Sequence, residues 1–310
     1  MAESSKRPHS APSLDPRLTH AHQLVRKADK LTTLSFFNWW PDWTQATPLY
    51  EQAATAYKLA KMLEEAKTCY EKAATGQERL SSPWTAGKHM ESAGALAKEL
   101  GRIDETVVLY RRASELFLEC GKAQPSADVL GRGARAVEDE SPEVAIRMYL
   151  DACAMLEEDG REQMAFDTYR AVVNLYIKLN RFKDAAALLV RWGQAADKCH
   201  ATQSQCKAYL SAIIVHLYDE DLKQAQQCYN DCSQMDVFYK SDQGETAEKL
   251  LSAYGEESSD EIKHVVDSSY IIPHLDHMIV RLAKQLPKGE LKTIFPVEPS
   301  DDKLNEDDLT

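Results

Sequence analysis

The sequence predicts an all-α protein, a right-handed α-solenoid of tetratricopeptide-like helical hairpins with about fourteen helices. Three observations support this fold class. A packing pattern recurs about every twenty residues, and residues that end helices recur in phase with it. No strand-like alternation bounded by turn residues competes with these two signals.

The packing pattern is a small residue, three others, a bulky apolar residue, two others and a second small residue, as in Ala46-Tyr50-Ala53. Offsets of four and three place the three on one helical face, where the small residues let neighbouring helices approach around the bulky one. The bulky positions, which we call rungs, are Tyr50, Tyr70, Met90, Tyr110, Leu130, Tyr149, Tyr169, Leu189, Tyr209 and Tyr229. Their spacing slips by one residue only once, between Leu130 and Tyr149.

The helix ends agree with this pattern. Gly101, Gly121, Gly160 and Asn180 each lie nine residues before a rung, and these residue types tolerate the left-handed conformation that ends a helix. Two serine-proline pairs read as an N-cap followed by proline at the first helical position; they are Ser82-Pro83 and Ser141-Pro142. Each unit is therefore one helix and one tight turn, and two units make a hairpin of about forty residues.

Further helices are expected outside the rungs, at residues 20–34, 245–254, 259–267 and 275–286. Gly255 should end the second of these, a Ser259-Asp260 cap should begin the third, and Pro287 should halt the last.

The chain accordingly divides into three parts. Residues 1–12 are polar and proline-containing, and we expect them to be disordered. Residues 13–296 should form the solenoid, with a C-terminal helical bundle from about residue 245. Residues 297–310 are acidic and too polar to pack, so they should form a tail.

Composition limits the function and the compartment. The formal net charge of -12 argues against a general nucleic-acid binder, which needs a surplus of basic residues. The first residues lack the apolar core of a secretion signal, and no stretch approaches a membrane span. Seven cysteines, an odd number, favour reduced thiols in a cytoplasmic protein.

No pattern indicates catalysis, a cofactor or a metal site, so we expect a binding scaffold rather than an enzyme. Cys228 and Cys232 are four apart but lack a second ligand pair with zinc-site spacing, which makes packing thiols the better interpretation. His274 and His277 have no glutamate in a metalloprotease arrangement and suit a polar helix edge. Gly133 reads as a small packing residue rather than part of a phosphate loop.

The first candidate binding feature is an aromatic stretch from Leu34 to Trp43. Its five rings are Phe36, Phe37, Trp39, Trp40 and Trp43. They could all be core at a helical corner, or some could stand out for a membrane interface, where tryptophan is enriched. We expect Phe36 and Trp39 to face inward and Phe37, Trp40 and Trp43 to face outward.

The second candidate feature is positive charge on alternate helices. Arg132 and Arg135 lie on the unit around Leu130, and Arg170 and Lys178 lie on the unit around Tyr169. Together they could form a basic strip for an acidic partner such as a negatively charged helical bundle. The alternative is that they are ordinary solvated side chains.

The third candidate feature is the acidic tail. Leu309 follows Asp307 and Asp308 at the end of the sequence. Such a terminus is either a solubility feature or a docking peptide, with charge for steering and leucine for a pocket.

These features together resemble the soluble NSF attachment protein family, or SNAPs, and most closely its gamma branch. The resemblance covers about residues 20 to 310. The residues that carry it are Phe36-Phe-Asn-Trp39-Trp-Pro41-Asp42, then Trp43, then AATAYKLAKMLEEAK from Ala53 to Lys67. The C-terminal end, LDHMIVRLAKQL with an acidic DDL terminus, is more similar to the alpha branch.

The resemblance implies an adaptor without catalytic activity. Such an adaptor coats the syntaxin-type four-helix SNARE bundle and recruits the hexameric ATPase N-ethylmaleimide-sensitive factor, NSF, for vesicle fusion and intracellular transport. It also implies that Arg132, Arg135 and Arg170 lie near the SNARE-facing surface, that the aromatic loop makes a peripheral membrane contact, and that Leu309 acts in stimulating the ATPase. Two other classes remain open on the sequence alone: another tetratricopeptide-type scaffold, as in a co-chaperone or a helical-repeat complex, and an enzyme carried on a solenoid.

Overall fold

The computed structural model describes residues 16–33 and 40–288, and every regular element in these ranges is helical. The all-α solenoid prediction is confirmed. In the first half the helices are α1 (Pro16–Thr32), α2 (Trp43–Leu59), α3 (Leu63–Arg79), α4 (Pro83–Glu99), α5 (Ile103–Glu119), α6 (Ala123–Val137) and α7 (Pro142–Glu158). They are followed by η1 (Glu162–Ala165), α8 (Phe166–Lys178), α9 (Phe182–Lys198), α10 (Thr202–Tyr218), α11 (Leu222–Cys232), α12 (Asp236–Tyr239), α13 (Asp242–Gly255), α14 (Ser259–Ser268), η2 (Ile272–His274) and α15 (His277–Ala283).

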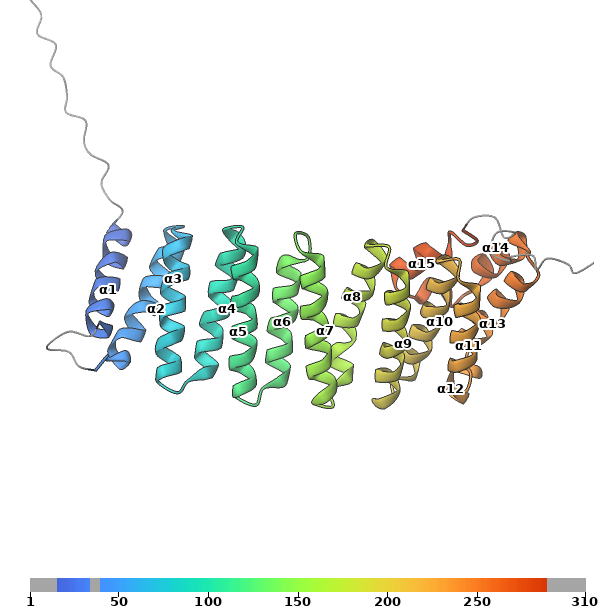
Figure 1. The fold of residues 1–310 in the computed structure, drawn as a ribbon, viewed down its shortest axis with the longest axis horizontal. Helices are drawn as coiled ribbons and strands as arrows, with labels where there is room; N and C mark the ends of the chain where they lie inside the picture. Colours follow the sequence, from blue (N-terminus) through green and yellow to red (C-terminus); the bar gives the residue numbers. More distant parts are fainter. Residues whose placement is uncertain (1–15, 34–39, 289–310) are drawn as a thin grey trace, which may run out of the picture. The chain divides into compact units, whose positions relative to one another are not determined.

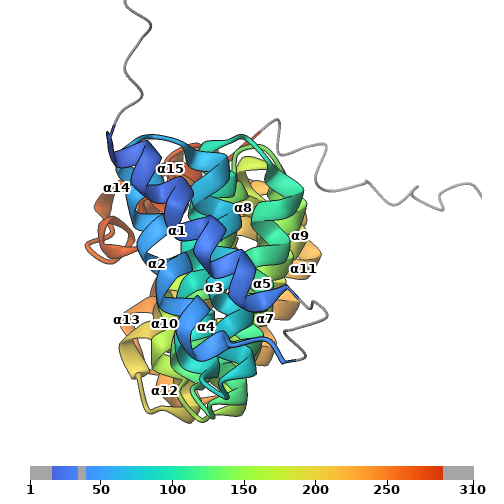
Figure 2. The same ribbon diagram turned by 90° about the vertical axis from the view of Figure 1, so that its left-hand side faces the viewer.

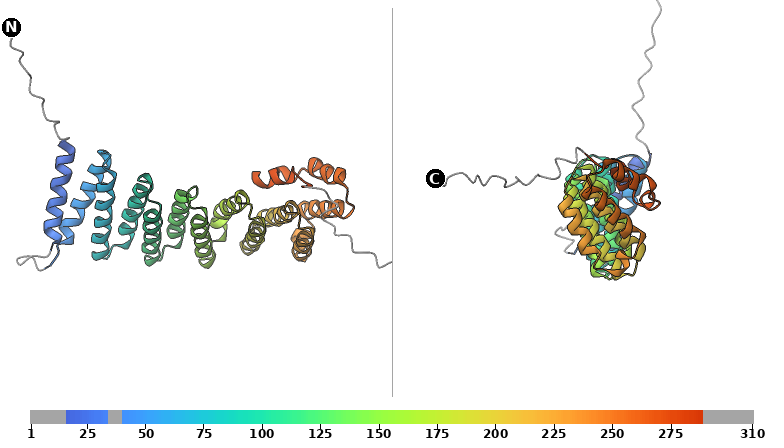
Figure 3. Two further views of the ribbon diagram at one scale, coloured as in Figure 1. Left: turned by 45° about the horizontal axis from the view of Figure 1, so that its top comes forward. Right: turned by 90° about the vertical axis from the view of Figure 1, so that its right-hand side faces the viewer.

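The chain forms two compact units, one reaching Arg161 and the other beginning at Glu162. In the first unit, α1 to α7 lie side by side in chain order, each antiparallel to the next (Figure 1, Figure 2). Within the second unit, α8 to α11 also pack in chain order, and α13 and α15 both pack against α10 (Figure 3). Within the second unit, α10 thus packs against more helices than its two neighbours in the chain.

The packing pattern in the sequence corresponds to the observed core. Its small residues are buried throughout, with alanines such as Ala46, Ala113 and Ala185 fully inaccessible. Most rungs are buried as well, but Tyr70, Met90 and Tyr229 are only partly covered. Gly133 shows why the flanking residues are small, because a Cβ atom there would stand 2.7 Å from the Cβ of Tyr110.

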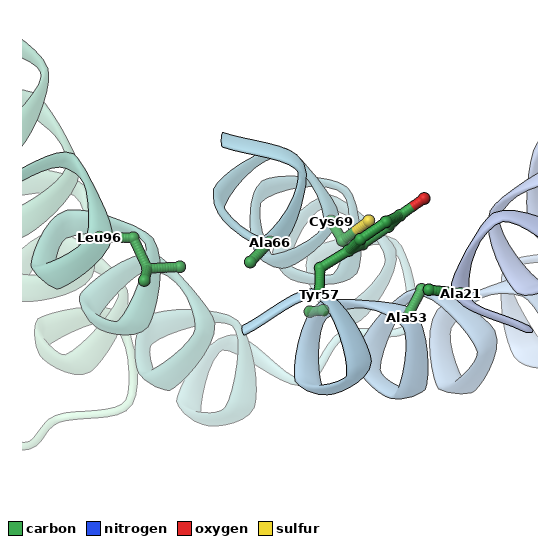
Figure 4. Packing of buried hydrophobic residues seen from close by; sticks show 7 residues of the cluster. Ala21, Ala53, Tyr57, Ala66, Cys69 and Leu96 are labelled. Carbon is green, nitrogen blue, oxygen red and sulfur yellow. The ribbon is translucent and has the colours of Figure 1, made fainter. Parts of the chain in front are cut away.

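One core cluster joins the first four helices (Figure 4). Ala21 of α1 faces Ala53 of α2, and the ring of Tyr57 lies beside Cys69 of α3. Leu96 of α4 completes the cluster, so each hairpin buries apolar surface against the next one. This nearest-neighbour packing is characteristic of a solenoid.

The helix ends follow one geometry. At Gly101, Gly121, Gly160 and Asn180 the φ angle is positive, between 56° and 73°, as predicted. The turns close by two hydrogen bonds, as in the bond of 2.9 Å from Arg102 N to Ala97 O. The same position is held by ordinary residues elsewhere, namely Lys61, Ser81, His200 and Glu220. The α6–α7 connection has no such left-handed residue, which explains the one-residue slip between Leu130 and Tyr149.

Several predicted helix boundaries were wrong. Helix α13 ends at Gly255 as predicted, but it begins at Asp242, three residues earlier than expected, and the left-handed residue is Glu257. The cap of α14 is Ser258, one residue before the predicted pair, and its hydroxyl accepts from Glu261 N at 3.2 Å. The predicted helix over 275–286 is shortened to α15, because Asp276 caps a new start after the 3-10 turn η2.

Ser82 and Ser141 do occupy N-cap positions before proline, but their hydroxyls make no capping hydrogen bond. The Ser82 hydroxyl instead donates to Thr85 Oγ1 at 3.1 Å.

Polar contacts connect alternate helices of the first unit. Six of them have nitrogen–oxygen distances between 2.6 and 3.0 Å and join each helix to the next but one; they are Lys72–Asp29, Arg102–Glu64, Arg112–Glu78, Arg111–Asp151, His89–Glu51 and Arg132–Glu91. Lys67, which is only 6% exposed, pairs with Glu105 in the same way. We call this set the inter-hairpin contacts, and they tie neighbouring hairpins together along both faces of the row.

Candidate functional site

The connection between α1 and α2 forms an aromatic corner. Asp42 caps α2 by accepting a hydrogen bond of 3.0 Å from Gln45 N, and its own amide donates to Leu31 O at 2.9 Å. These bonds hold the end of the loop against α1. Trp40, just before the cap, is 85% exposed, as expected for an outward side chain. Phe36, Phe37 and Trp39 lie outside the described residues.

Trp43 does not face fully outward as we expected. Its ring is partly buried against a cluster that includes Ala46 and Tyr50, with Leu31 packed alongside. The first turn of α2 places this ring over the α1–α2 interface, so it supports the corner from within. Of the two described rings, Trp40 is therefore the one available for a partner.

A polar contact group lies at the base of the corner. The Tyr50 hydroxyl donates to Asp29 Oδ1 at 2.6 Å, and Lys72 Nζ lies 2.7 Å from the same oxygen. Burial alone would raise the pKa of Asp29, but the hydrogen bonds from Lys72 and Tyr50 hold it below its usual value. For Tyr50, burial together with its bond to Asp29 raises the pKa. These groups join α1, α2 and α3.

The two arginines on α6 are exposed and lie three residues apart. The Arg132 guanidinium pairs with Glu91 of α4 at 2.6 Å. Arg135 lies near Tyr149, whose hydroxyl donates to Glu138 at 3.1 Å. Burial and the Glu138 carboxylate raise the pKa of Tyr149 to about 12, and the positive charge of Arg135 opposes this effect.

In the second unit, Arg170 lies at a groove of about 470 Å³ formed by residues of α8, α9, α10 and the segment from η2 to α15. It pairs with Asp167 at 2.6 Å and with Asp276 at 3.5 Å, and its guanidinium carbon is 5.9 Å from the centre of the Trp192 ring. Lys178 is exposed at the end of the same helix. Arg132 and Arg135 belong to the first unit and these two residues to the second, so a continuous basic strip stays a prediction.

Sequence reasoning missed the acidic partners of these arginines. Glu91 lies 41 residues before Arg132, close to the length of one hairpin, and this separation places the two side chains on successive helices of the same set. The repeat period could therefore have identified Glu91. Asp276 gave no comparable signal, because it reaches Arg170 only through the packing of η2 and α15 in the second unit.

The remaining candidates are the cysteine and histidine pairs and the acidic tail. Cys228 and Cys232 are buried on α11, whereas His274 and His277 are exposed. Residues 16–33 and 40–288 contain no group of three side chains suited to hold a metal ion. No helix among them is both long enough and apolar enough to cross a bilayer. Asp307, Asp308 and Leu309 lie outside the described residues.

Comparison with known proteins connects this arrangement to a family. Residues 19–285 match the family model described as "Soluble NSF attachment protein, SNAP". The chain is 56% identical over 288 residues to a gamma-soluble NSF attachment protein of Arabidopsis thaliana, an alignment that covers 93% of this chain and 98% of that protein.

More distant relatives extend the similarity. A gamma-soluble NSF attachment protein of Dictyostelium discoideum is 28% identical over 262 residues, covering 84% of this chain and 81% of that protein. The vesicular-fusion protein SEC17 of Komagataella phaffii is 26% identical over 306 residues, covering 94% of this chain and 100% of that protein.

Proposed function

The chain belongs to the soluble NSF attachment protein family, as a gamma-like member, and on this premise we propose that it is the adaptor that brings NSF to SNARE complexes. The ATPase then takes these complexes apart during vesicle fusion and intracellular transport. The observation that carries the proposal is the match over residues 19–285, which spans nearly all of the described helices. Another kind of tetratricopeptide scaffold is not favoured, because the family match extends over the whole solenoid.

As an adaptor, the chain would bind and hold the SNARE complex and would leave catalysis to the ATPase. Tight packing at the small residues and the inter-hairpin contacts oppose sliding of one hairpin past the next. A stiff first unit would pass force from the ATPase to the bound bundle instead of absorbing it by bending. This property supports a role in which several copies act together on one complex.

We assign the contact with the acidic SNARE bundle to Arg132, Arg135, Arg170 and Lys178. In the free protein Arg132 is held by Glu91, and Arg170 by Asp167 and Asp276. Exposed ion pairs of this kind are worth only about 0–1 kcal/mol, so carboxylates of a partner can replace them at small cost. The intramolecular acids would keep these arginines from binding weaker anions, which favours a densely charged partner.

We assign peripheral membrane contact, and with it a cytoplasmic protein that works at membranes, to the aromatic corner. Trp40 supports this assignment because it is almost fully exposed next to a capped helix start. Phe37 would add to the contact directly. Phe36 and Trp39, which we expect to face inward, would support the loop together with Trp43. Two or three rings in a membrane interface give weak, reversible binding, which suits a protein that acts in several copies.

We assign stimulation of the ATPase to the tail, residues 297–310, with Leu309 as the apolar anchor and Asp307 and Asp308 as the charged flank. Deleting Leu309 and Thr310 should lower ATP hydrolysis by NSF while SNARE binding stays unchanged. Unaltered hydrolysis would contradict this assignment without touching the SNARE assignment.

The adaptor function is tested with purified components. The chain should pull down assembled SNARE complex and, through it, NSF, and ATP with magnesium should release both. It should also accelerate disassembly of a fluorescently labelled SNARE complex by the ATPase. Failure to retain the ATPase on SNARE-loaded beads, with an alpha-type SNAP as positive control, would refute the proposal.

A further inference from the structure

Large apolar side chains are exposed at one end of the first unit. The helices alternate in direction, so the α1–α2, α3–α4 and α5–α6 connections all lie at the same end (Figure 1). At this end Trp40 is 85% exposed, Leu80 40%, Trp84 38% and Leu118 47%. We call these four residues the apolar edge.

The opposite end of the first unit differs in composition. It carries the α2–α3, α4–α5 and α6–α7 connections, where Leu59 is 69% exposed, and Val108 in the second turn of α5 is 65% exposed. Its other exposed residues include Lys61 and Arg102. The concentration of apolar side chains at one end is therefore a property of that end and not of solenoid turns in general.

The apolar edge is held in a fixed arrangement. The Trp84 ring packs 4.9 Å from the ring of Phe117, which joins the start of α4 to the end of α5. Leu80 follows the last turn of α3, and its turn is closed by a 2.8 Å bond from Ser82 N to Gln77 O. Leu118 lies in the last turn of α5, just before the left-handed Gly121. The backbone that carries Leu80, Trp84 and Leu118 would therefore need little ordering when a partner binds.

Basic side chains lie beside the apolar edge. Lys88 Nζ lies 5.1 Å from the centre of the Trp84 ring, and Arg79 and Lys122 are exposed in the same turns. Three nearby acids, Glu78, Glu115 and Glu119, share one partner, Arg112, so the four basic side chains named here stand against three acidic ones. Tryptophan with lysine and arginine at the rim is the composition that suits an anionic lipid surface. The end of α7 carries the exposed acids Glu158 and Asp159, so the edge stops at α5.

We propose that an anionic bilayer surface contacts the whole apolar edge, including Leu80, Trp84 and Leu118, and not the aromatic corner alone. This inference rests on the membrane contact assigned above, because it extends that contact to the α3–α4 and α5–α6 connections at the same end. A contact at one corner would leave the protein free to pivot. Contacts at all three connections of this end place the row of hairpins along the surface with the helices rising from it.

The test measures co-sedimentation of the full chain with vesicles of phosphatidylcholine containing phosphatidylserine. The variant is the double substitution Leu80→Ser and Leu118→Ser. Because these side chains are 40% and 47% exposed, the variant loses some apolar burial, and circular dichroism at the assay temperature checks that it stays folded. Binding to vesicles should weaken roughly tenfold, since two apolar side chains no longer enter the interface. Leu59→Ser is the matched control at the opposite end, and it should bind like the unmodified chain. Trp40→Ser reports on the corner alone.

The outcomes distinguish membrane contact along the whole apolar edge from membrane contact at the aromatic corner alone. Loss of binding in the double variant but not in Leu59→Ser supports the apolar edge. Loss in Trp40→Ser alone overturns the edge and leaves the corner as the membrane contact. Equal binding by all variants, or no binding by the unmodified chain, rejects both. If the double variant instead weakens recruitment of NSF to SNARE complex in the absence of lipid, the edge is a protein-binding surface and the inference is wrong.

Discussion

Two glycines on α6, Gly131 and Gly133, should respond in opposite directions to the same substitution. Replacing a glycine inside a helix with alanine stabilises by up to about 1 kcal/mol, because alanine has less backbone freedom to lose on folding. At Gly131 a Cβ atom meets nothing within 4 Å, so the helix keeps this gain. We expect Gly131→Ala to stabilise the protein by roughly 0.5–1 kcal/mol.

At Gly133 the new methyl group has no room. It would stand 2.7 Å from Met148 Cε, which can rotate away, and 2.7 Å from Tyr110 Cβ, which is attached directly to the backbone of α5. Helix α5 must therefore move away from α6. Inserting a methyl into a packed core costs about 1–3 kcal/mol, so Gly133→Ala should destabilise by about 0.5–2 kcal/mol after the gain in helix propensity.

The assay is urea unfolding followed by far-ultraviolet circular dichroism, with both variants and the unmodified chain measured together. The two midpoints should move to opposite sides of the unmodified one, at a similar slope. If Gly133→Ala stabilises as much as Gly131→Ala, helices α5 and α6 can separate without cost. Small residues would then not be what sets the spacing of the solenoid.

Three further predictions concern binding, pH and turns. Arg132→Gln should weaken SNARE binding several-fold, whereas Glu91→Gln should strengthen it because it releases Arg132 from its partner. Titration with labelled SNARE complex measures both affinities. A shift of both in the same direction would count against Arg132 as a contact. The lowered pKa of Asp29 means that its ionised form stabilises the fold, so this stability is present above the unfolded pKa of about 3.9 and is lost as the pH falls through the lower folded value. Urea midpoints of Asp29→Asn and the unmodified chain should therefore differ at pH 7 and converge as the pH falls through the folded pKa of Asp29, and a constant difference would contradict the role of ionisation. Lys61→Gly should raise stability by roughly 0.5–1 kcal/mol, because φ is 58° there and a side chain is strained in that region. Gly101→Ala at the equivalent turn should lower stability for the same reason. Thermal unfolding tests both variants, and melting temperatures equal to that of the unmodified chain would refute the strain.

The candidate site was only partly predictable from local sequence. The exposed Trp40 follows from its position before the Asp42 cap, which is a local signal. The half-buried position of Trp43 depends on where α1 presents Leu31, and the apolar edge depends on which connections share an end. Charge partners such as Glu91 and Asp276 arise between helices that are far apart in the chain, so a list of arginines alone overstated the free positive charge.

By itself, the sequence determined the repeat. Small and bulky residues in phase about every twenty positions are sufficient to specify one helix per unit, its buried face and its neighbours, because each solenoid unit packs only on the next. Glycines at Gly101 and Gly121 marked two turns, but Lys61 and Ser81 fill the same role without any local preference for it. Only tertiary packing decided those turns, the shortened α15 and the surroundings of each arginine. In each case the free energy comes from contacts between helices, which can impose a conformation that the residue would not adopt in isolation.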